Sequence, residues 1–307
     1  MLLLIEQLLN GLQLGVMLFL MSAGLTLVFG IMGVINLAHG SFYMVGAYVA
    51  ATVTEQSGSF LLGLLLALPA VALVGMAVEA LVLRRLYKKD HLDQVLATFG
   101  LIMFFNELTR IIWGRQPLFM DVPAWLSGTV ELIPGAPYPS YRLAVIAMGI
   151  LVALFLYLLF TRTRLGMQIR AGAANREMVA ALGVNIKVLY TLVFGLGAML
   201  AGLAGVMAGP ILAVEAGMGE SILILTFVVI VIGGIGSIRG ALIAALLVGL
   251  VDTLGRAFLP GFFRLFLPLA EADGVAASLA SMLVYILMAM ILIWRPQGLF
   301  PAQGSIS

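Results

Sequence analysis

The chain has 307 residues, of which 63% are apolar and only 10% are charged, and its mean hydropathy is +1.17. A soluble globular domain carries about 25% charged residues because water wets its surface, so this composition excludes one. The formal net charge of +2 gives no reason to expect a nucleic acid partner, and the lack of cysteine excludes disulfides and thiolate metal sites. The composition predicts a protein surrounded by membrane lipid.

Apolar runs follow one another along the chain, and each is long enough to form a membrane-spanning helix of roughly 20 residues. They are far longer than barrel strands, and unpaired backbone amides are not tolerated in lipid, so we predict an all-α polytopic protein with a single transmembrane domain over residues 1–307. The first run lacks a basic flank and a cleavage site, and we expect it to be retained. The expected spans are residues 8–30, 36–54, 59–83, 93–113, 142–160, 188–212, 221–237, 240–258 and 275–294.

Two junctions between these runs contain glycines and polar residues instead of a real loop. They are GVINLAHG at 33–40 and GGIGSIRG at 233–240. One or both are expected to be broken or re-entrant helices, so the total is predicted to be eight, nine or ten spans. The similarity of the two junctions is explained either by chance or by an internal repeat whose broken helices line a substrate path.

Basic residues set the expected orientation, because loops rich in Lys and Arg stay in the cytoplasm. They gather in residues 84–92 and in residues 161–187, so both loops are expected to be cytoplasmic and the N-terminus external. The residues concerned are Arg84, Arg85, Lys88 and Lys89 in the first loop, and Arg162, Arg164, Arg170, Arg176 and Lys187 in the second.

The polar segment 114–140 is expected on the external, periplasmic side. It is rich in proline, including Pro123 and Pro134, and is therefore predicted to be ordered but largely non-helical. It is either an inert connector or a docking surface for an external partner.

Charged residues inside a membrane are costly, so each is expected to have a partner of opposite charge. Spacings of three to five residues place such partners about one helical turn apart, and we interpret the pairs as structural. The expected pairs are Glu107 with Arg110, Asp252 with Arg256, and Glu79 with Arg84 or Arg85.

His39 lies in the first junction, close to Asn36, Gly40 and Tyr43. A lone His offers neither a metal cage nor a catalytic triad, so no metal site and no intramembrane enzyme is expected. Its side chain either caps a broken helix or faces the transport path together with Asn36. The pattern G-x-x-x-x-G-K-[ST] is absent, so the chain is not expected to bind ATP or another cofactor itself.

A short helix is predicted within the basic loop 161–187. Asn175 can cap a helix that begins at Arg176, and Gly183 suits the left-handed conformation that ends one. This helix is either a surface turn or an element on which a partner docks.

Four stretches resemble the LivH-type permeases of branched-chain amino acid ABC importers. They are GLTLVFGIMGVINLAHGSFYMVGAYVA (24–50), TRTRLGMQIRAGAANREMVAALGVNIKVLYTL (161–192), VVIVIGGIGSIRGALIAALLVGL (228–250) and RPQGLF (295–300). The resemblance implies a multi-pass subunit of the bacterial inner membrane. Its implied partners are a second, LivM-like permease, two cytoplasmic ABC ATPases that bind the ATP, and a periplasmic amino-acid-binding protein.

The resemblance also leads us to expect two sets of site residues. A coupling helix seated in an ATPase cleft would involve Arg170, Ala174, Asn175, Ala180, Ala181 and Gly183. A substrate path would be lined at the two junctions by Asn36, His39, Gly40, Tyr43, Gly233, Gly234, Gly236 and Ser237.

The expected function is amino acid import by alternating access, driven by the partner ATPases. Related permeases serve urea, short amides or aromatic acids, so the resemblance leaves these substrates as alternatives. An ion-coupled secondary transporter would need a buried, unpaired carboxylate, and the acids in the spans have basic neighbours.

Overall fold

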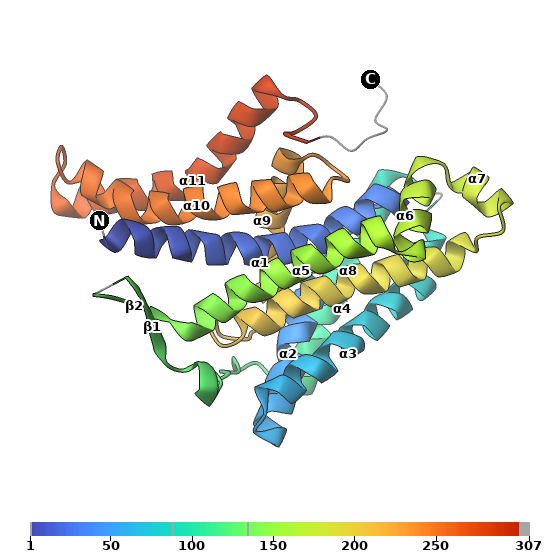
Figure 1. Cartoon of the computed structure of the whole chain (residues 1–307), viewed down its shortest axis with the longest axis horizontal. Helices are drawn as coiled ribbons and strands as arrows, with labels where there is room; N and C mark the ends of the chain where they lie inside the picture. Colours follow the sequence, from blue (N-terminus) through green and yellow to red (C-terminus); the bar gives the residue numbers. More distant parts are fainter. Residues whose placement is uncertain (1, 88, 134, 301–307) are drawn as a thin grey trace.

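The computed structural model describes residues 2–87, 89–133 and 135–300, and it is mostly helical (Figure 1). Lys88 and Pro134, which the sequence analysis placed in the first basic loop and in the proline-rich segment, lie outside the described residues. The helices are α1 (Leu2–Met32), α2 (His39–Ser57), α3 (Phe60–Leu81), η1 (Leu83–Arg85), α4 (His91–Trp113), η2 (Ala124–Leu126), α5 (Ser140–Arg162), α6 (Arg164–Ala174), α7 (Arg176–Ala181), α8 (Ile186–Ala208), α9 (Met218–Gly233), α10 (Ile238–Phe263) and α11 (Leu269–Trp294).

Seven of the described helices are long and apolar enough to cross a membrane, namely α1, α3, α4, α5, α8, α10 and α11. The other two expected spans correspond to α2, which is rich in Gly, Ser, Thr and Tyr, and to α9, which has only 16 residues. The all-α polytopic architecture is therefore confirmed, and every expected apolar run has a helix. The two helices that differ from full apolar spans are those that flank the predicted junctions.

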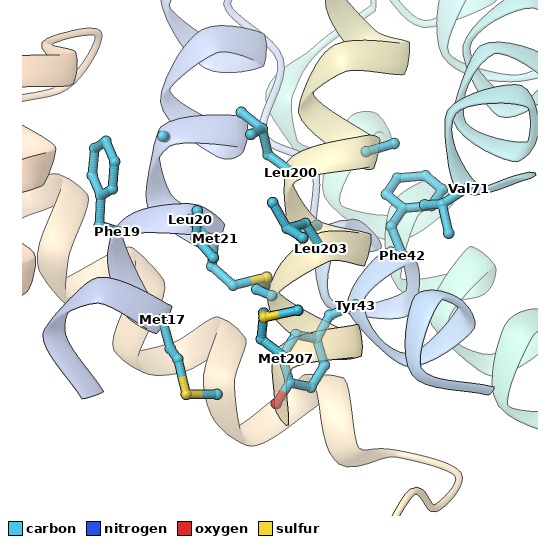
Figure 2. Packing of buried hydrophobic residues seen from close by; sticks show 14 of the residues in the cluster. Met17, Phe19, Leu20, Met21, Phe42, Tyr43, Val71, Leu200, Leu203 and Met207 are labelled. Atoms are coloured by element: carbon cyan, nitrogen blue, oxygen red, sulfur yellow. The ribbon is translucent and has the colours of Figure 1, made fainter. Parts of the chain in front are cut away.

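Two helices form the centre of the bundle. In α1 and in α8, 78% of the most apolar stretch is buried, against 22% in α4 and 17% in α11. Helix α1 packs against α8 and α10, and α8 also packs against α2 and α3. Figure 2 shows side chains from α1, α2, α3 and α8 filling the space between these helices, including Met21, Tyr43 and Leu203. Helices α3, α4, α5, α10 and α11 lie around this centre and expose apolar side chains such as Leu65, Ile111 and Leu151.

Glycines allow the central helices to approach closely. A Cβ added at Gly15 of α1 would lie 2.8 Å from the Cα of Leu246 in α10, and one added at Gly46 of α2 would lie 2.5 Å from the Cα of Gly202 in α8. Small residues at such crossings let backbones pack directly on one another in membranes. Gly202 of α8 has this packing role.

The segment between α4 and α5 is largely non-helical, as expected, but it also contains a hairpin that was not expected. Strands β1 (Thr129–Ile133) and β2 (Ala136–Pro139) pair antiparallel, with Gly135 at φ +82° in the turn. Outside the hairpin, Leu118 bridges to Val214, just before α9. The hairpin lies near the N-terminus at one end of the molecule, whereas α6 and α7 lie at the other end (Figure 1).

Candidate functional site

The first predicted junction is a true break between two helices. Helix α1 ends at Met32, residues 33–38 are not helical, and α2 begins at His39. Gly33 takes a left-handed conformation with φ +65°, which glycine adopts without strain. The Asn36 Oδ1 accepts a hydrogen bond of 3.1 Å from the backbone N–H of Ala38 and so shapes the turn that enters α2.

His39 fixes the position of this break. Its side chain is fully buried, and Nε2 lies 3.2 Å from the carbonyl oxygen of Met21 in the middle of α1. Because a carbonyl only accepts, Nε2 carries the proton and donates it. The expected hydrogen bond of His39 therefore exists, but it joins α2 to α1 and does not cap a broken helix. As a result, α2 begins inside the bundle.

The first turns of α2 and α9 meet inside the bundle, where α2 begins. A Cβ added at Gly40 would lie 2.3 Å from the carbonyl oxygen of Gly219, and the Sδ of Met44 lies 3.3 Å from the backbone nitrogen of Gly217. The first amides of a helix lack partners within the helix and carry a partial positive charge. Two such helix starts therefore face the same small region.

A narrow pocket opens where α2, α4 and α9 converge. Its polar lining includes Ser41, Asn106 and Glu220, and the Asn106 Nδ2 donates a 2.7 Å hydrogen bond to the Glu220 Oε1. Its apolar lining comes from Leu37, Met44, Ile102 and Leu223, and the glycine lining from Gly40 and Gly219. The pocket thus combines a carboxylate, an amide, two helix starts and an apolar wall.

Of the path residues expected in the first break, Gly40 lines this pocket. Asn36, His39 and Tyr43 are buried in the packing around it. The Asn36 Nδ2 and the His39 Nδ1 find no hydrogen-bond partner among the described residues. Buried polar atoms are usually satisfied, so these two atoms are exceptions to the rule. Their place on a substrate path stays a prediction.

The second predicted junction is also a break, at the opposite end of α9. Gly234 and Gly236 have φ values of +101° and +82°, and the Ser237 Oγ accepts a 3.1 Å hydrogen bond from Gly240 N–H at the start of α10. The carbonyl of Gly233 accepts a 3.0 Å hydrogen bond from the backbone of Phe300. With a rise of 1.5 Å per residue, α9 separates this break from the pocket by about 20 Å. The eight expected path residues therefore do not form one site.

The basic loop 161–187 contains two helices, of which α6 was not expected. Asn175 caps α7, because its Oδ1 accepts a 2.9 Å hydrogen bond from Met178 N–H, and Gly183 has φ +87°, as expected. Val179 points inward, whereas the expected coupling residues are exposed, namely Arg170, Ala174, Asn175, Ala180, Ala181 and Gly183. Met178 and Leu182 beside them are 59% and 77% exposed, so this tip presents two apolar side chains among polar and charged ones.

The expected ion pairs are formed. Arg84 lies 2.8 Å from Glu79, Arg256 lies 2.9 Å from Asp252, and Arg110 lies 3.4 Å from Glu107 in an exposed position. Arg85 instead donates to the carbonyl of Leu81. These acids therefore have the basic partners that their spacing predicted.

Comparison with known proteins identifies the family. The sequence profile of the permease component of branched-chain amino acid transport systems matches residues 7–292. The chain belongs to this family. The resemblance drawn from its motifs is thereby confirmed, and the chain is a transport permease subunit.

Individual relatives of this permease cover most of its length. It is 29% identical to the high-affinity branched-chain amino acid transport system permease protein BraD of Pseudomonas aeruginosa, over 96% of this chain and 95% of that protein. It is 28% identical to LivH of Escherichia coli K12, over 83% of this chain and 87% of that protein. It is also 28% identical to LivM of the same organism, over 92% of this chain and 67% of that protein. No solved structure matches the chain.

Sequence reasoning missed several residues of this permease that the structure places in the pocket. Ser41, Asn106 and Glu220 come from three helices, and Asn106 and Glu220 are 114 positions apart in the chain. One sequence signal for Glu220 was present. It directly follows Gly219, two residues after Gly217, and closely spaced glycines are typical of a helix start that lies close to another backbone.

Proposed function

We propose that this permease is a membrane subunit of an ATP-driven importer for branched-chain or related amino acids. The family match over residues 7–292 carries the proposal. The chain has no Walker motif, so the ATP is bound by two partner ATPases. A second permease of the LivM type completes the membrane part, and a periplasmic binding protein delivers the amino acid in the bacterial inner membrane.

The chemistry of the pocket fits an amino acid. The carboxylate of the substrate would lie against the amides at the starts of α2 and α9, where the helix dipoles favour negative charge. The carboxylate of Glu220 would attract the ammonium group, and Leu37, Ile102 and Leu223 offer an apolar wall to an aliphatic side chain. Urea and short amides carry neither charge, so this pocket supports an amino acid over them.

The pocket has to open for transport to occur. In this conformation it holds no more than about one water molecule. The contact between Gly40 and Gly219 joins α2 to α9, so a path at this level requires their first turns to separate. Alternating access then needs two states, in which α2 and α9 are either in contact or apart, and the ATPases bias one against the other.

The exposed tip formed by α6 and α7 supports docking of an ATPase. Met178 and Leu182 are apolar and exposed at the end of the molecule where the basic residues gather. An apolar face on a short helix, flanked by charge, suits insertion into a groove of a partner protein. The loop 161–187 is accordingly proposed to be cytoplasmic.

The alternative function, an ion-coupled secondary transporter, is less well supported. Glu79, Asp252 and Glu107 are paired with arginines, and Glu220 accepts a hydrogen bond from Asn106. A coupling-ion site needs a carboxylate that is free to exchange its partner during the cycle. Uptake that continues without ATP would favour this rival.

Uptake of labelled leucine tests the proposal. The chain, a LivM-type permease, the two ATPases and the binding protein are reconstituted in proteoliposomes, with or without ATP at the ATPase side. We expect uptake only with ATP, inhibited by unlabelled isoleucine and valine but not by urea. Inhibition by urea or phenylalanine instead would change the substrate that we assign to the permease. Uptake indifferent to ATP would contradict the importer mechanism.

A further inference from the structure

A buried carboxylate that does not line the pocket lies at the end of α3. The side chain of Glu79 is 0% exposed. It accepts hydrogen bonds from the Arg84 Nε at 3.3 Å and Nη2 at 2.8 Å, from the Tyr87 hydroxyl at 2.6 Å and from the Thr191 hydroxyl at 2.6 Å. The Arg84 Nη2 also donates to the Thr191 Oγ1 at 2.7 Å. We call these four residues the Glu79 cluster.

The Glu79 cluster joins elements that are distant in the chain. Glu79 belongs to α3, Arg84 to η1 and Tyr87 to the turn after it, whereas Thr191 belongs to α8. Helix α8 starts at Ile186, directly after the loop that carries α6 and α7. The cluster therefore connects the first turns of α8 to the end of α3.

The Glu79 cluster also reaches the last turn of α1. The Tyr87 hydroxyl lies 3.9 Å from the Sδ of Met32, and the Tyr87 ring packs edge-on against the ring of Tyr190 with centroids 5.5 Å apart. The Tyr190 hydroxyl donates to the carbonyl of Ile31 at 3.3 Å. The first break starts at Gly33, immediately after these residues.

The bonds of the Glu79 cluster resist separation of the helices that they join. A buried carboxylate that loses a donor remains as an uncompensated charge in an apolar region, which is strongly unfavourable. Burial raises the pKa of Tyr87, so its hydroxyl keeps the proton that it donates. The first residue of the neighbouring break has room by contrast, since a Cβ added at Gly33 would meet no heavy atom within 4 Å, whereas Val34, Asn36 and Ala38 after it are buried. A firm cluster thus lies next to a glycine at which the backbone has room to turn.

We propose that Glu79 is a positioning residue that holds the start of α8, the end of α3 and the end of α1 together, so that they move as one body. Movement of α6 and α7 then reaches the first break through this body and bends the chain at Gly33. The contact between α2 and α9 opens as a consequence. The inference rests on the proposed function, because it assigns a transmission element to that transport cycle.

The test is the number of leucine molecules transported per ATP hydrolysed by the complete complex in proteoliposomes. Glu79→Gln removes the charge that Arg84 and Tyr87 hold, and it keeps the size of the side chain. We expect ATP hydrolysis to continue and the transport ratio to fall at least about fivefold, the lower end of typical coupling effects. A purely structural role would lower assembly, hydrolysis and uptake in parallel and leave the ratio unchanged.

Asp252→Asn is the matched control. Asp252 is also buried, with its side chain 11% exposed, and is also paired with an arginine through two contacts of 2.9 Å. Its partner Arg256 belongs to the same helix, so this pair joins no separate elements. We expect the transport ratio of Asp252→Asn to equal that of the wild type.

Two milder variants decide the matter if Glu79→Gln does not assemble. Tyr87→Phe and Thr191→Val each remove one donor and keep the Glu79–Arg84 pair, so each should lower the transport ratio by a smaller factor. If the wild-type complex takes up leucine with ATP and none of these variants lowers the amount of leucine transported per ATP, the proposed role of Glu79 is wrong. If the wild type shows no ATP-dependent uptake, the proposed function itself is wrong.

Discussion

Gly40 at the start of α2 packs directly on Gly219 at the start of α9, backbone against backbone. A Cβ added at Gly40 would lie 2.3 Å from the Gly219 carbonyl oxygen, and one added at Gly219 would lie 2.0 Å from the Gly40 carbonyl oxygen. Neither obstacle is a flexible side chain, so a substitution at either position has to move a helix. This contact makes the junction of α2 and α9 sensitive to a single methyl group.

Gly40→Ala is expected to separate the first turns of α2 and α9. Overpacking of this kind costs about 1–3 kcal/mol, so the unfolding temperature in detergent should fall and leucine uptake by the complex should be lost or strongly reduced. Gly100→Ala is the control, because a Cβ there meets no heavy atom within 4 Å. Equal stability and uptake of the two variants would contradict the close contact.

Glu220→Gln tests the charge in the pocket. The glutamine oxygen can still accept from Asn106, but the attraction for the substrate ammonium is lost. A hydrogen bond to a charged group contributes about 1.5–3 kcal/mol, so uptake at leucine concentrations well below saturation should fall roughly tenfold or more. Glu271→Gln, in the exposed first turn of α11, should have no such effect. Unchanged uptake in Glu220→Gln would remove this residue from the path.

His39→Phe tests the connection between α2 and α1. Phenylalanine fills the space but removes the hydrogen bond to the Met21 carbonyl, which keeps its helical backbone donor, so the loss is about 0.5–1.5 kcal/mol. The unfolding temperature should fall accordingly. His39→Gln, whose amide can donate to the same carbonyl, should be closer to the wild type. If both variants are as stable as the wild type, the hydrogen bond does not hold α2 in place.

Leu182→Asp tests docking at the tip formed by α6 and α7. Leu182 is 77% exposed, so the charge should not unfold the chain but should disrupt an apolar contact with an ATPase. We expect loss of co-purification with the ATPases at unchanged thermal stability. Leu265→Asp is a matched control, since Leu265 is 76% exposed in the turn between α10 and α11. An intact ATPase complex with Leu182→Asp would place the docking surface elsewhere.

Local signals allowed much of the fold to be predicted from the sequence. Apolar runs reveal helices in lipid because every backbone amide must be paired there, and the cap of α7 needs only Asn175 and Gly183. The ion pairs Glu79–Arg84 and Asp252–Arg256 follow from spacing alone. Each of these features depends on residues that are close together in the chain.

The remaining features depend on contacts between distant residues, which hydropathy does not report. That α2 begins inside the bundle follows from the bond between His39 and Met21, and the pocket depends on Asn106 meeting Glu220. The second break is closed by the backbone of Phe300, which a local pattern does not indicate. The predicted path residues were chosen because they belong to two similar sequence motifs. In the structure, the two motifs lie near opposite ends of α9.

The most direct test of the account is whether α2 and α9 must separate during transport. The chain contains no cysteine, so Ser41→Cys and Leu223→Cys place a unique thiol pair in the pocket, one on each helix. The complete complex is treated with a short cleavable thiol crosslinker, and ATP-dependent leucine uptake is measured before treatment, after it and after cleavage, with each single variant as control. We predict that uptake stops in the crosslinked double variant and returns on cleavage. Uptake at the untreated rate while α2 and α9 remain crosslinked would contradict the account.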